Sequence, residues 1–214
     1  MSRFNFDFDG NSVKTDWVEY FHDFFQYAAG DFTITDTGTS ANAVAAGVAN
    51  GILELVTGAT SGNATFLDHK TEAFKWNASK KLYFGARFAL ADVLATDIVM
   101  GLQITDTTPL AVSDGIWFGK DNGDALLDAH VAKASAQTDL NAVATLSNNT
   151  YVTAEFYYNG DGRKIELYVN SRAVGSLPIG NAPSEELCVS FGIRTNAAAA
   201  KKLSVDWIRV VQER

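Results

Sequence analysis

Two glutamates on neighbouring predicted strands are the first residues with the chemistry of a catalytic pair. Glu155 precedes, and Glu166 follows, a turn built from Asn-Gly and Asp-Gly pairs at 159–162, so a hairpin would bring the two carboxylates close together. Two carboxylates are the acid and the nucleophile or base that cleavage of a glycosidic bond requires. Carboxylates on a sheet surface are more often solubilising groups that point into water. We therefore interpret this pair as structural and predict no catalytic residue.

The histidines and the cysteine do not form a recognisable reactive set. His22, His69 and His130 are far apart, and none has a second ligand at the spacing of a zinc site. Cys188 has no histidine near it in sequence, so we interpret it as a packed thiol; a catalytic thiol paired through space is the alternative. The chain also lacks a Gly-x-Ser-x-Gly motif and a Walker-type phosphate loop. We predict no metal, no cofactor and no enzymatic activity.

Two acidic turns have the composition of a calcium site. Asp121-Asn122-Gly123-Asp124 is one of them, and the other is the Asn-Gly-Asp-Gly turn at 159–162. Clustered carboxylate, amide and carbonyl oxygens are the ligands that calcium prefers, but neither turn is followed by the glutamate that completes a twelve-residue calcium loop. Asn, Asp and Gly are also the usual residues of tight turns. The turn interpretation is favoured for both segments.

Aromatic residues at strand positions are candidates for stacking against sugar rings. Trp117 lies between Ile116 and Phe118, so strand alternation places its ring on the opposite face from theirs. Tyr157 and Tyr168 are further candidates. We name Trp117, with Asp121 in the following turn, as the possible glycan contacts, while burial in a core or an interface is the competing interpretation.

The densest apolar segment of the chain is an aromatic block at 17–27. Its aromatic residues recur at helical spacing, Asp16 is a suitable N-cap and Gly30 a suitable stop, so we expect one short helix here. The block is rich enough to serve either as a protein interface or as a plug for an open end of the fold. The possible interface residues are Trp17, Tyr20, Phe21, Phe24 and Phe25.

Composition excludes several classes of function. The 214 residues carry a net charge of −8, which argues against binding to nucleic acid, and no apolar run is long enough for a transmembrane helix. The N-terminal segment carries acidic residues where a secretory signal peptide would be apolar. We therefore expect a protein that is made in the cytoplasm and is not exported through a signal peptide. One cysteine cannot form an intramolecular disulfide. The fold must therefore depend on burial and backbone hydrogen bonds.

The apolar residues that a core would need recur mostly at every second position, which is typical of strands. We predict strands at 82–90, 98–104, 187–193 and 203–211, a hairpin over 151–169, and a short strand at 173–176 after a turn at 170–172. The strand at 203–211 is apolar on both faces and is predicted to be central. Shorter strands are expected at 4–8, 32–35 and 51–57. The pattern predicts an all-β, antiparallel two-sheet sandwich or jelly roll.

The first 50 residues have weaker signals than the rest. Residues 37–50 are built from Gly, Ala, Thr, Ser and Asn without a clear period, and we expect a long surface loop or arm. We therefore divide the chain into an N-terminal strand, helix and arm at 1–50 that packs on a jelly-roll sandwich at 51–214, together forming one compact unit.

Seven segments carry a resemblance to a known family. They are TGAT (57–60), EAFK (72–75), KLYFGARF (81–88), VMGL (99–102), DGIWF (114–118), FYYNG (156–160) and LSVDWIRV (203–210). In order and spacing they resemble the concanavalin A-like, or laminin G-like, jelly-roll modules of structural proteins of tailed bacteriophages. The resemblance covers about three quarters of the chain.

The resemblance implies a role on a virion. It suggests a capsid decoration (cement) protein on the capsid surface that binds the major capsid protein as a homo-oligomer, with a trimer expected, and stabilises the shell by mass action. The alternative is a carbohydrate-binding adhesin or tail-fibre module that binds a host-surface glycan. Polysaccharide-degrading enzymes of the same fold carry a Glu-x-Asp-x-x-Glu strand that this sequence lacks, so enzymatic cleavage is the weakest hypothesis.

Overall fold

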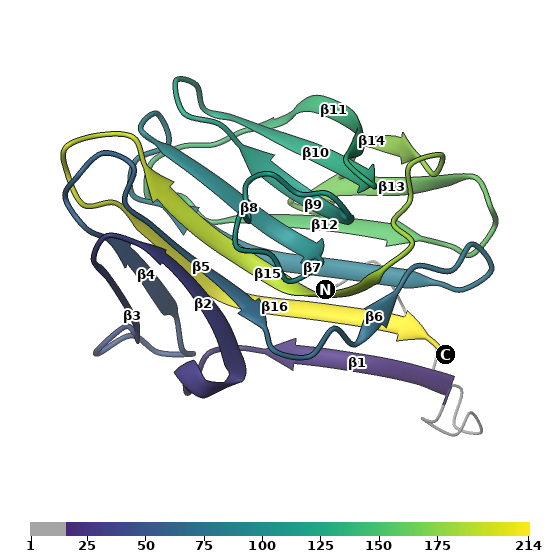
Figure 1. Ribbon diagram of the computed structural model, residues 1–214, viewed down its shortest axis with the longest axis horizontal. Helices are drawn as coiled ribbons and strands as arrows, with labels where there is room; N and C mark the ends of the chain where they lie inside the picture. Colours follow the sequence, from purple (N-terminus) through teal and green to yellow (C-terminus); the bar gives the residue numbers. More distant parts are fainter. Residues whose placement is uncertain (1–15) are drawn as a thin grey trace.

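A computed structural model describes residues 16–214, which form two antiparallel sheets stacked face to face (Figure 1). The sheet that contains the C-terminal strand, here the β16 sheet, has the order β14 (Arg172–Pro178), β13 (Lys164–Val169), β12 (Val152–Tyr158), β7 (Leu82–Leu90), β16 (Lys202–Glu213), β4 (Leu53–Thr57) and β3 (Ser40–Val44), and β1 (Trp17–His22) also pairs with β16. The other, here the β15 sheet, has the order β11 (Ala136–Thr145), β10 (Leu126–Lys133), β9 (Gly115–Lys120), β8 (Thr96–Gln103), β15 (Glu186–Thr195), β5 (Ala64–His69) and β2 (Phe32–Thr37), and β6 (Phe74–Lys75) also pairs with β15. The predicted all-β sandwich is confirmed.

The core lies between the sheets and is built from alternate residues of their central strands. Phe84 and Phe88 of β7 and Phe156 of β12 face Phe191 and Ile193 of β15, and all five are essentially inaccessible to water. Each such side chain stabilises the fold by about 1.5 to 3 kcal/mol relative to an exposed one. Residues at the intervening positions are left to form the two outer faces, where sites for ligands can be built.

Several predictions about individual strands are confirmed. β12 and β13 form the expected hairpin, and Asn170 and Ser171, with φ of 49° and 62°, make the two-residue turn into β14. β16 is central, because it pairs with β7 on one side and with β4 and β1 on the other. Both edges of the strand are therefore hydrogen-bonded.

The predicted helix over the aromatic block is wrong. Residues 17–22 form β1, which pairs antiparallel with β16 from Trp17 opposite Glu213 to His22 opposite Ile208. The unpaired edge of β16 offers backbone hydrogen bonds along the whole segment, and this tertiary pairing outweighs the local helical spacing. A 3₁₀ turn, η2 (Ala29–Asp31), is the one helical element among the described residues. Residues 16–214 thus contain no helix of the length and apolar character that a bilayer crossing requires.

The predicted surface arm at 37–50 is also wrong in its central part. Ser40–Val44 forms β3, an edge strand paired with β4, and the Asn42 side chain exchanges hydrogen bonds with Thr65 of the other sheet. Small and polar residues suit an edge strand that has one solvated side. β1 and β3 thus belong to one sheet and β2 to the other. The strand expected at 4–8 lies outside the described residues.

Candidate functional site

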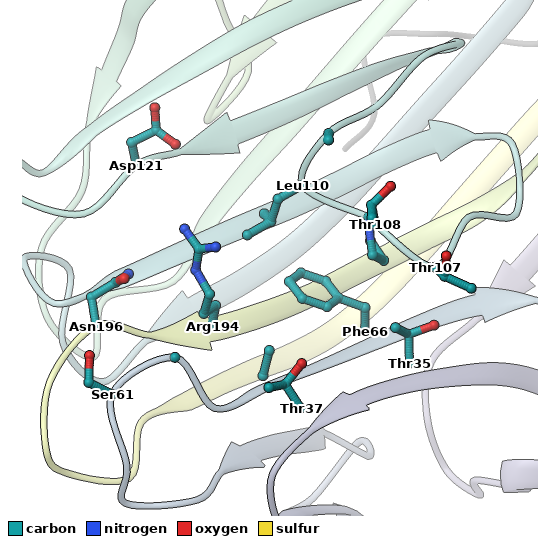
Figure 2. Close-up of a pocket in the computed structure, with 14 residues that line it drawn as sticks. Thr35, Thr37, Ser61, Phe66, Thr107, Thr108, Leu110, Asp121, Arg194 and Asn196 are labelled. Carbon is teal, nitrogen blue, oxygen red and sulfur yellow. The ribbon is translucent and has the colours of Figure 1, made fainter.

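The outer face of the β15 sheet carries a cleft of about 820 Å³ (Figure 2). Register places Thr35 of β2, Phe66 of β5 and Gly192 of β15 in one row across the sheet, and Thr35 and Phe66 of this row line the cleft. The β8–β9 loop at 107–111 and the β4–β5 turn at 61–62 form its walls. In Figure 2 the Phe66 ring lies between Arg194 and Thr35, with Leu110 above it.

A buried carboxylate fixes two polar side chains at one end of the cleft. Asp97 of β8 is 1% exposed and accepts hydrogen bonds from Arg194 Nε at 2.6 Å and from Asn196 Nδ2 at 2.6 Å. It also accepts the backbone N–H of Asn122 at 2.7 Å. Arg194 and Asn196 both line the cleft, whereas Asp97 does not. The network therefore holds a guanidinium and an amide in place before any ligand arrives, which lowers the entropic cost of binding.

Glycines on the outer face make room for aromatic side chains. A Cβ on Gly192 would lie 2.4 Å from Cδ1 of Phe66, and one on Gly101 would lie 2.5 Å from Cβ of Trp117. Phe66 and Trp117 belong to one apolar cluster on this face, and Leu110 of the β8–β9 loop packs against it. The loop therefore rests on an aromatic floor.

Trp117 and Asp121 lie beside each other on this face. Both line a hollow of about 120 Å³ that adjoins the larger cleft, and Asp121 and Leu110 are shared by the two. Trp117 faces away from Ile116 and Phe118, as strand alternation predicts, but only 6% of it is exposed. Its ring stacks on His130, whose Nδ1 lies 2.8 Å from Asp139 Oδ1. The structure thus brings the two suggested glycan contacts together in the small hollow beside the cleft, and Asp121 alone also lines the cleft.

The two glutamates considered at the outset do not oppose each other. Glu155 is opposite Tyr168, and Glu166 is opposite Tyr157, so the carboxylates are offset along the hairpin. Glu155 accepts the Tyr83 hydroxyl at 2.7 Å, and Glu166 accepts the Tyr168 hydroxyl at 2.9 Å. Both lie on the β16 sheet and outside the cleft.

The two acidic turns and Cys188 make hydrogen bonds within the protein that are typical of structural residues. In the 121–124 turn, Asp124 accepts the backbone N–H of Leu126 at 2.9 Å, and in the 159–162 turn Asp161 accepts that of Arg163 at 3.1 Å. Among residues 16–214, no three His, Cys, Asp or Glu side chains are grouped as a metal site would need. Cys188 is buried, and its thiol donates to the Gln103 carbonyl.

The aromatic block divides between the core and the surface. Phe24 is fully buried against Phe191, and Tyr20 packs on the same core. Phe21 and Phe25 are 55% and 70% exposed. Trp17 shares the outward side of β1 with Phe21. The interface prediction therefore remains for the outward members of the block.

Arg194, Asn196 and Thr35 are cleft residues that sequence reasoning missed. Arg194 is the penultimate residue of β15 and Asn196 follows that strand, so both lie just beyond the strand predicted at 187–193. Nothing local marks them, because their partner Asp97 is distant in sequence. A charged residue at the outer-facing end of an otherwise apolar strand was the one available signal.

This architecture places the protein in the class of concanavalin A-like sandwiches, which includes lectins and polysaccharide-cleaving enzymes. The endo-β-1,4-glucuronan lyase of the fungus Trichoderma reesei is similar in structure, with a TM-score of 0.61 at 10% identity over 89% of this chain and 94% of that one. Peanut lectin, solved with a nine-residue peptide, has a TM-score of 0.60 at 10% identity over 92% and 97% of the two chains.

A match to a family model narrows the assignment within the concanavalin A-like sandwiches. The chain belongs to the SO2946-like C-terminal domain family, whose profile matches residues 49–175. A protein of unknown function, SO2946 from Shewanella oneidensis MR-1, has a TM-score of 0.65 at 19% identity over 94% of this chain and 89% of that one. No curated protein sequence matches the chain. The predicted concanavalin A-like fold is confirmed, whereas none of these relatives is described as a bacteriophage structural protein.

Proposed function

We propose that this protein binds an oligosaccharide chain in the cleft on the outer face of the β15 sheet. The observation that carries the proposal is the Asp97 network, which presents Arg194 and Asn196 to the cleft in fixed positions. Ligand pockets typically combine apolar walls with a few such oriented polar groups. The similarity in fold to a lectin and to a glucuronan-cleaving enzyme supports carbohydrate as the ligand class.

Binding without cleavage is part of the proposal. Hydrolysis of a glycosidic bond uses two carboxylates about 5 to 10 Å apart. Among the described residues that line the cleft and its adjoining hollow, Asp121 is the one carboxylate. Asp97 is engaged by Arg194, Asn196 and the backbone of Asn122 and lies below the surface. A reducing-sugar assay and an absorbance assay for unsaturated products, on glucuronan and on mixed-linkage β-glucan, test this part.

A steric block tests the cleft without disturbing its network. Thr35 and Thr33 lie two residues apart on β2 with side chains on the same face, and Thr35 lines the cleft whereas Thr33 does not. We expect Thr35→Trp to weaken binding of β-glucan or glucuronan oligosaccharides by about tenfold or more in calorimetric titrations, while Thr33→Trp binds as the wild type does. Equal binding by all three proteins, or no binding to either glycan, refutes the proposal.

A virion role is the second candidate and rests on the outward aromatic residues. Phe21 and Phe25 are exposed to an extent that suits attachment to a partner such as a capsid protein or a second copy of the chain. Co-sedimentation of Phe21→Ala and wild-type protein with purified capsids tests it; the same recovery of both proteins contradicts this role.

A further inference from the structure

The outer face of the β16 sheet, on the opposite side of the sandwich from the cleft, has a hollow of its own. Its volume is about 320 Å³. Its aromatic lining residues are Phe21, Tyr83 and Trp207, and its polar lining residues include Glu155, Arg209 and Ser171. These residues come from β1, β7, β12, β16 and the β13–β14 turn, so the hollow crosses four strands of the sheet.

Strand register explains how the hollow forms. Phe21 is paired with Arg209, Arg209 with Gly85, and Gly85 with Glu155, so the four positions make one row across four strands. Gly85 has no side chain to fill the middle of this row. A Cβ there would lie 2.3 Å from the Tyr83 hydroxyl and 3.2 Å from Cζ3 of Trp207. The edges of two aromatic side chains therefore close over the glycine and form the floor.

The polar groups at the floor are held in place by the protein. Glu155 is only 7% exposed and accepts a hydrogen bond from the Tyr83 hydroxyl at 2.7 Å. Burial, together with the adjacent Glu155 carboxylate, raises the pKa of Tyr83, so its hydroxyl keeps its proton. Arg209 donates from Nε to Glu19 at 2.9 Å, which fixes the guanidinium at the rim. A carboxylate, a phenol and a guanidinium thus have set positions around an apolar floor.

Phe21 makes the apolar wall of the hollow accessible. The residue is more than half exposed, although the other aromatic residues of the hollow are buried or half-buried. An exposed aromatic ring next to oriented hydrogen-bonding groups is the combination that binds a molecule with one apolar face and a polar edge. A pyranose ring has that character, because its C–H groups form a face and its hydroxyls lie around the edge.

We propose that this hollow is a second carbohydrate site that takes a single neutral pyranose ring. Phe21 and Trp207 would contact the ring face, and Glu155 and Arg209 would bind its hydroxyls. Glu19 already pairs with Arg209, so Glu155 leaves negative charge in excess at the hollow, and this excess disfavours an acidic sugar. The volume suits one ring better than a chain. This proposal is independent of the cleft, which lies on the other sheet.

Tryptophan indole signals distinguish the two sites in one NMR titration. Trp207 lines the hollow and Trp117 lines the small hollow that adjoins the cleft. We expect methyl β-glucoside or methyl β-galactoside at millimolar concentration to shift the Trp207 indole and Gly85 amide signals in a saturable way, and glucuronic acid not to shift them. Shifts confined to Trp117 support the cleft and refute the second site.

Two exposed phenylalanines provide the variant and its control. Phe21→Ala removes the accessible wall, and we expect about fivefold to tenfold weaker binding at Trp207, which corresponds to the loss of one aromatic contact. Phe25→Ala removes an aromatic side chain that is exposed but does not line the hollow, and it should leave the titration unchanged. Equal effects of the two substitutions, or no shift of Trp207 with either glycoside, overturn the proposal. Self-association that is lost in Phe21→Ala, without any glycoside effect, would identify the face as a protein interface instead.

Discussion

Replacement of Asp97 by alanine tests the network that positions the cleft residues. The carboxylate is almost fully buried and accepts hydrogen bonds from three residues, Arg194, Asn196 and Asn122. Alanine removes all of these interactions at once. The Arg194 guanidinium loses its counter-ion, and the N–H of Asn122 loses its acceptor. We expect the variant to be less stable and to bind glycan more weakly.

The size of the effect follows from the burial of each partner. Removal of one partner from a buried ion pair costs about 3 to 5 kcal/mol. The Arg194 side chain is 41% exposed, so water can solvate the guanidinium that remains, and the lower end of that range applies. A loss of about 3 kcal/mol lowers the melting temperature by about 6 to 12 °C in a domain of this size.

Urea unfolding followed by tryptophan fluorescence measures this loss. Asp121→Ala is the control, because this exposed carboxylate lines the same cleft and should change stability little. The double variant Asp97→Ala with Arg194→Met should lose less than the sum of the two single variants, since both remove the same interaction. A change of less than about 1 kcal/mol for Asp97→Ala, or strict additivity, would show that the network does not act as described.

Three further predictions concern the outer face of the β15 sheet and its surroundings. Burial and the nearby Asp68 raise the pKa of Cys188 to about 12, so iodoacetamide should label the thiol only after unfolding; rapid labelling of the native protein contradicts its burial. Burial also raises the pKa of Asp68, so the folded state holds its proton more tightly, and stability is lost as pH rises through the unfolded and then the folded pKa. Asp68→Asn should therefore gain stability over wild type with increasing pH in urea titrations, and a constant difference would argue against this. Gly192→Ala places a Cβ 2.5 Å from the Thr65 carbonyl oxygen and should cost about 1 to 3 kcal/mol in the same assay, whereas Gly180→Ala, with open space around it, should be neutral.

The fold could be predicted from the sequence wherever the spacing of apolar residues was compatible with a strand and not with a helix. In β7, β12 and β15 the apolar residues at every second position match the inner face directly. The aromatic block was ambiguous, because residues four apart, such as Trp17 and Phe21, share a face in a helix and in a strand alike. The edge of β16 decided between the two, and this edge is a tertiary feature. Residues 40–44 gave no signal because an edge strand needs few apolar residues.

The site was less predictable than the fold, because it depends on register. Alternation placed Trp117 on the outer face, but it could not place Asp121 beside it or show that Leu110 covers this face. Arg194 meets Asp97 only because β15 and β8 pair in one particular register, in which these two residues are opposite each other. A shift of one residue would turn Arg194 toward the core. Alternation within each single strand does not reveal how two strands are aligned with each other.

Glycines within both sheets help to explain why each outer face is hollowed. Phe66 lies across Gly192 on the β15 sheet, and Trp207 and Tyr83 lie across Gly85 on the β16 sheet. The two faces differ in what covers them, since the β8–β9 loop packs on the aromatic floor of the first, while the hollow on the second remains open to Phe21. The first therefore suits an extended chain that runs beside a loop, and the second suits a small ring that stacks directly. A substitution in one of the two hollows should leave the other unchanged, because the core separates them.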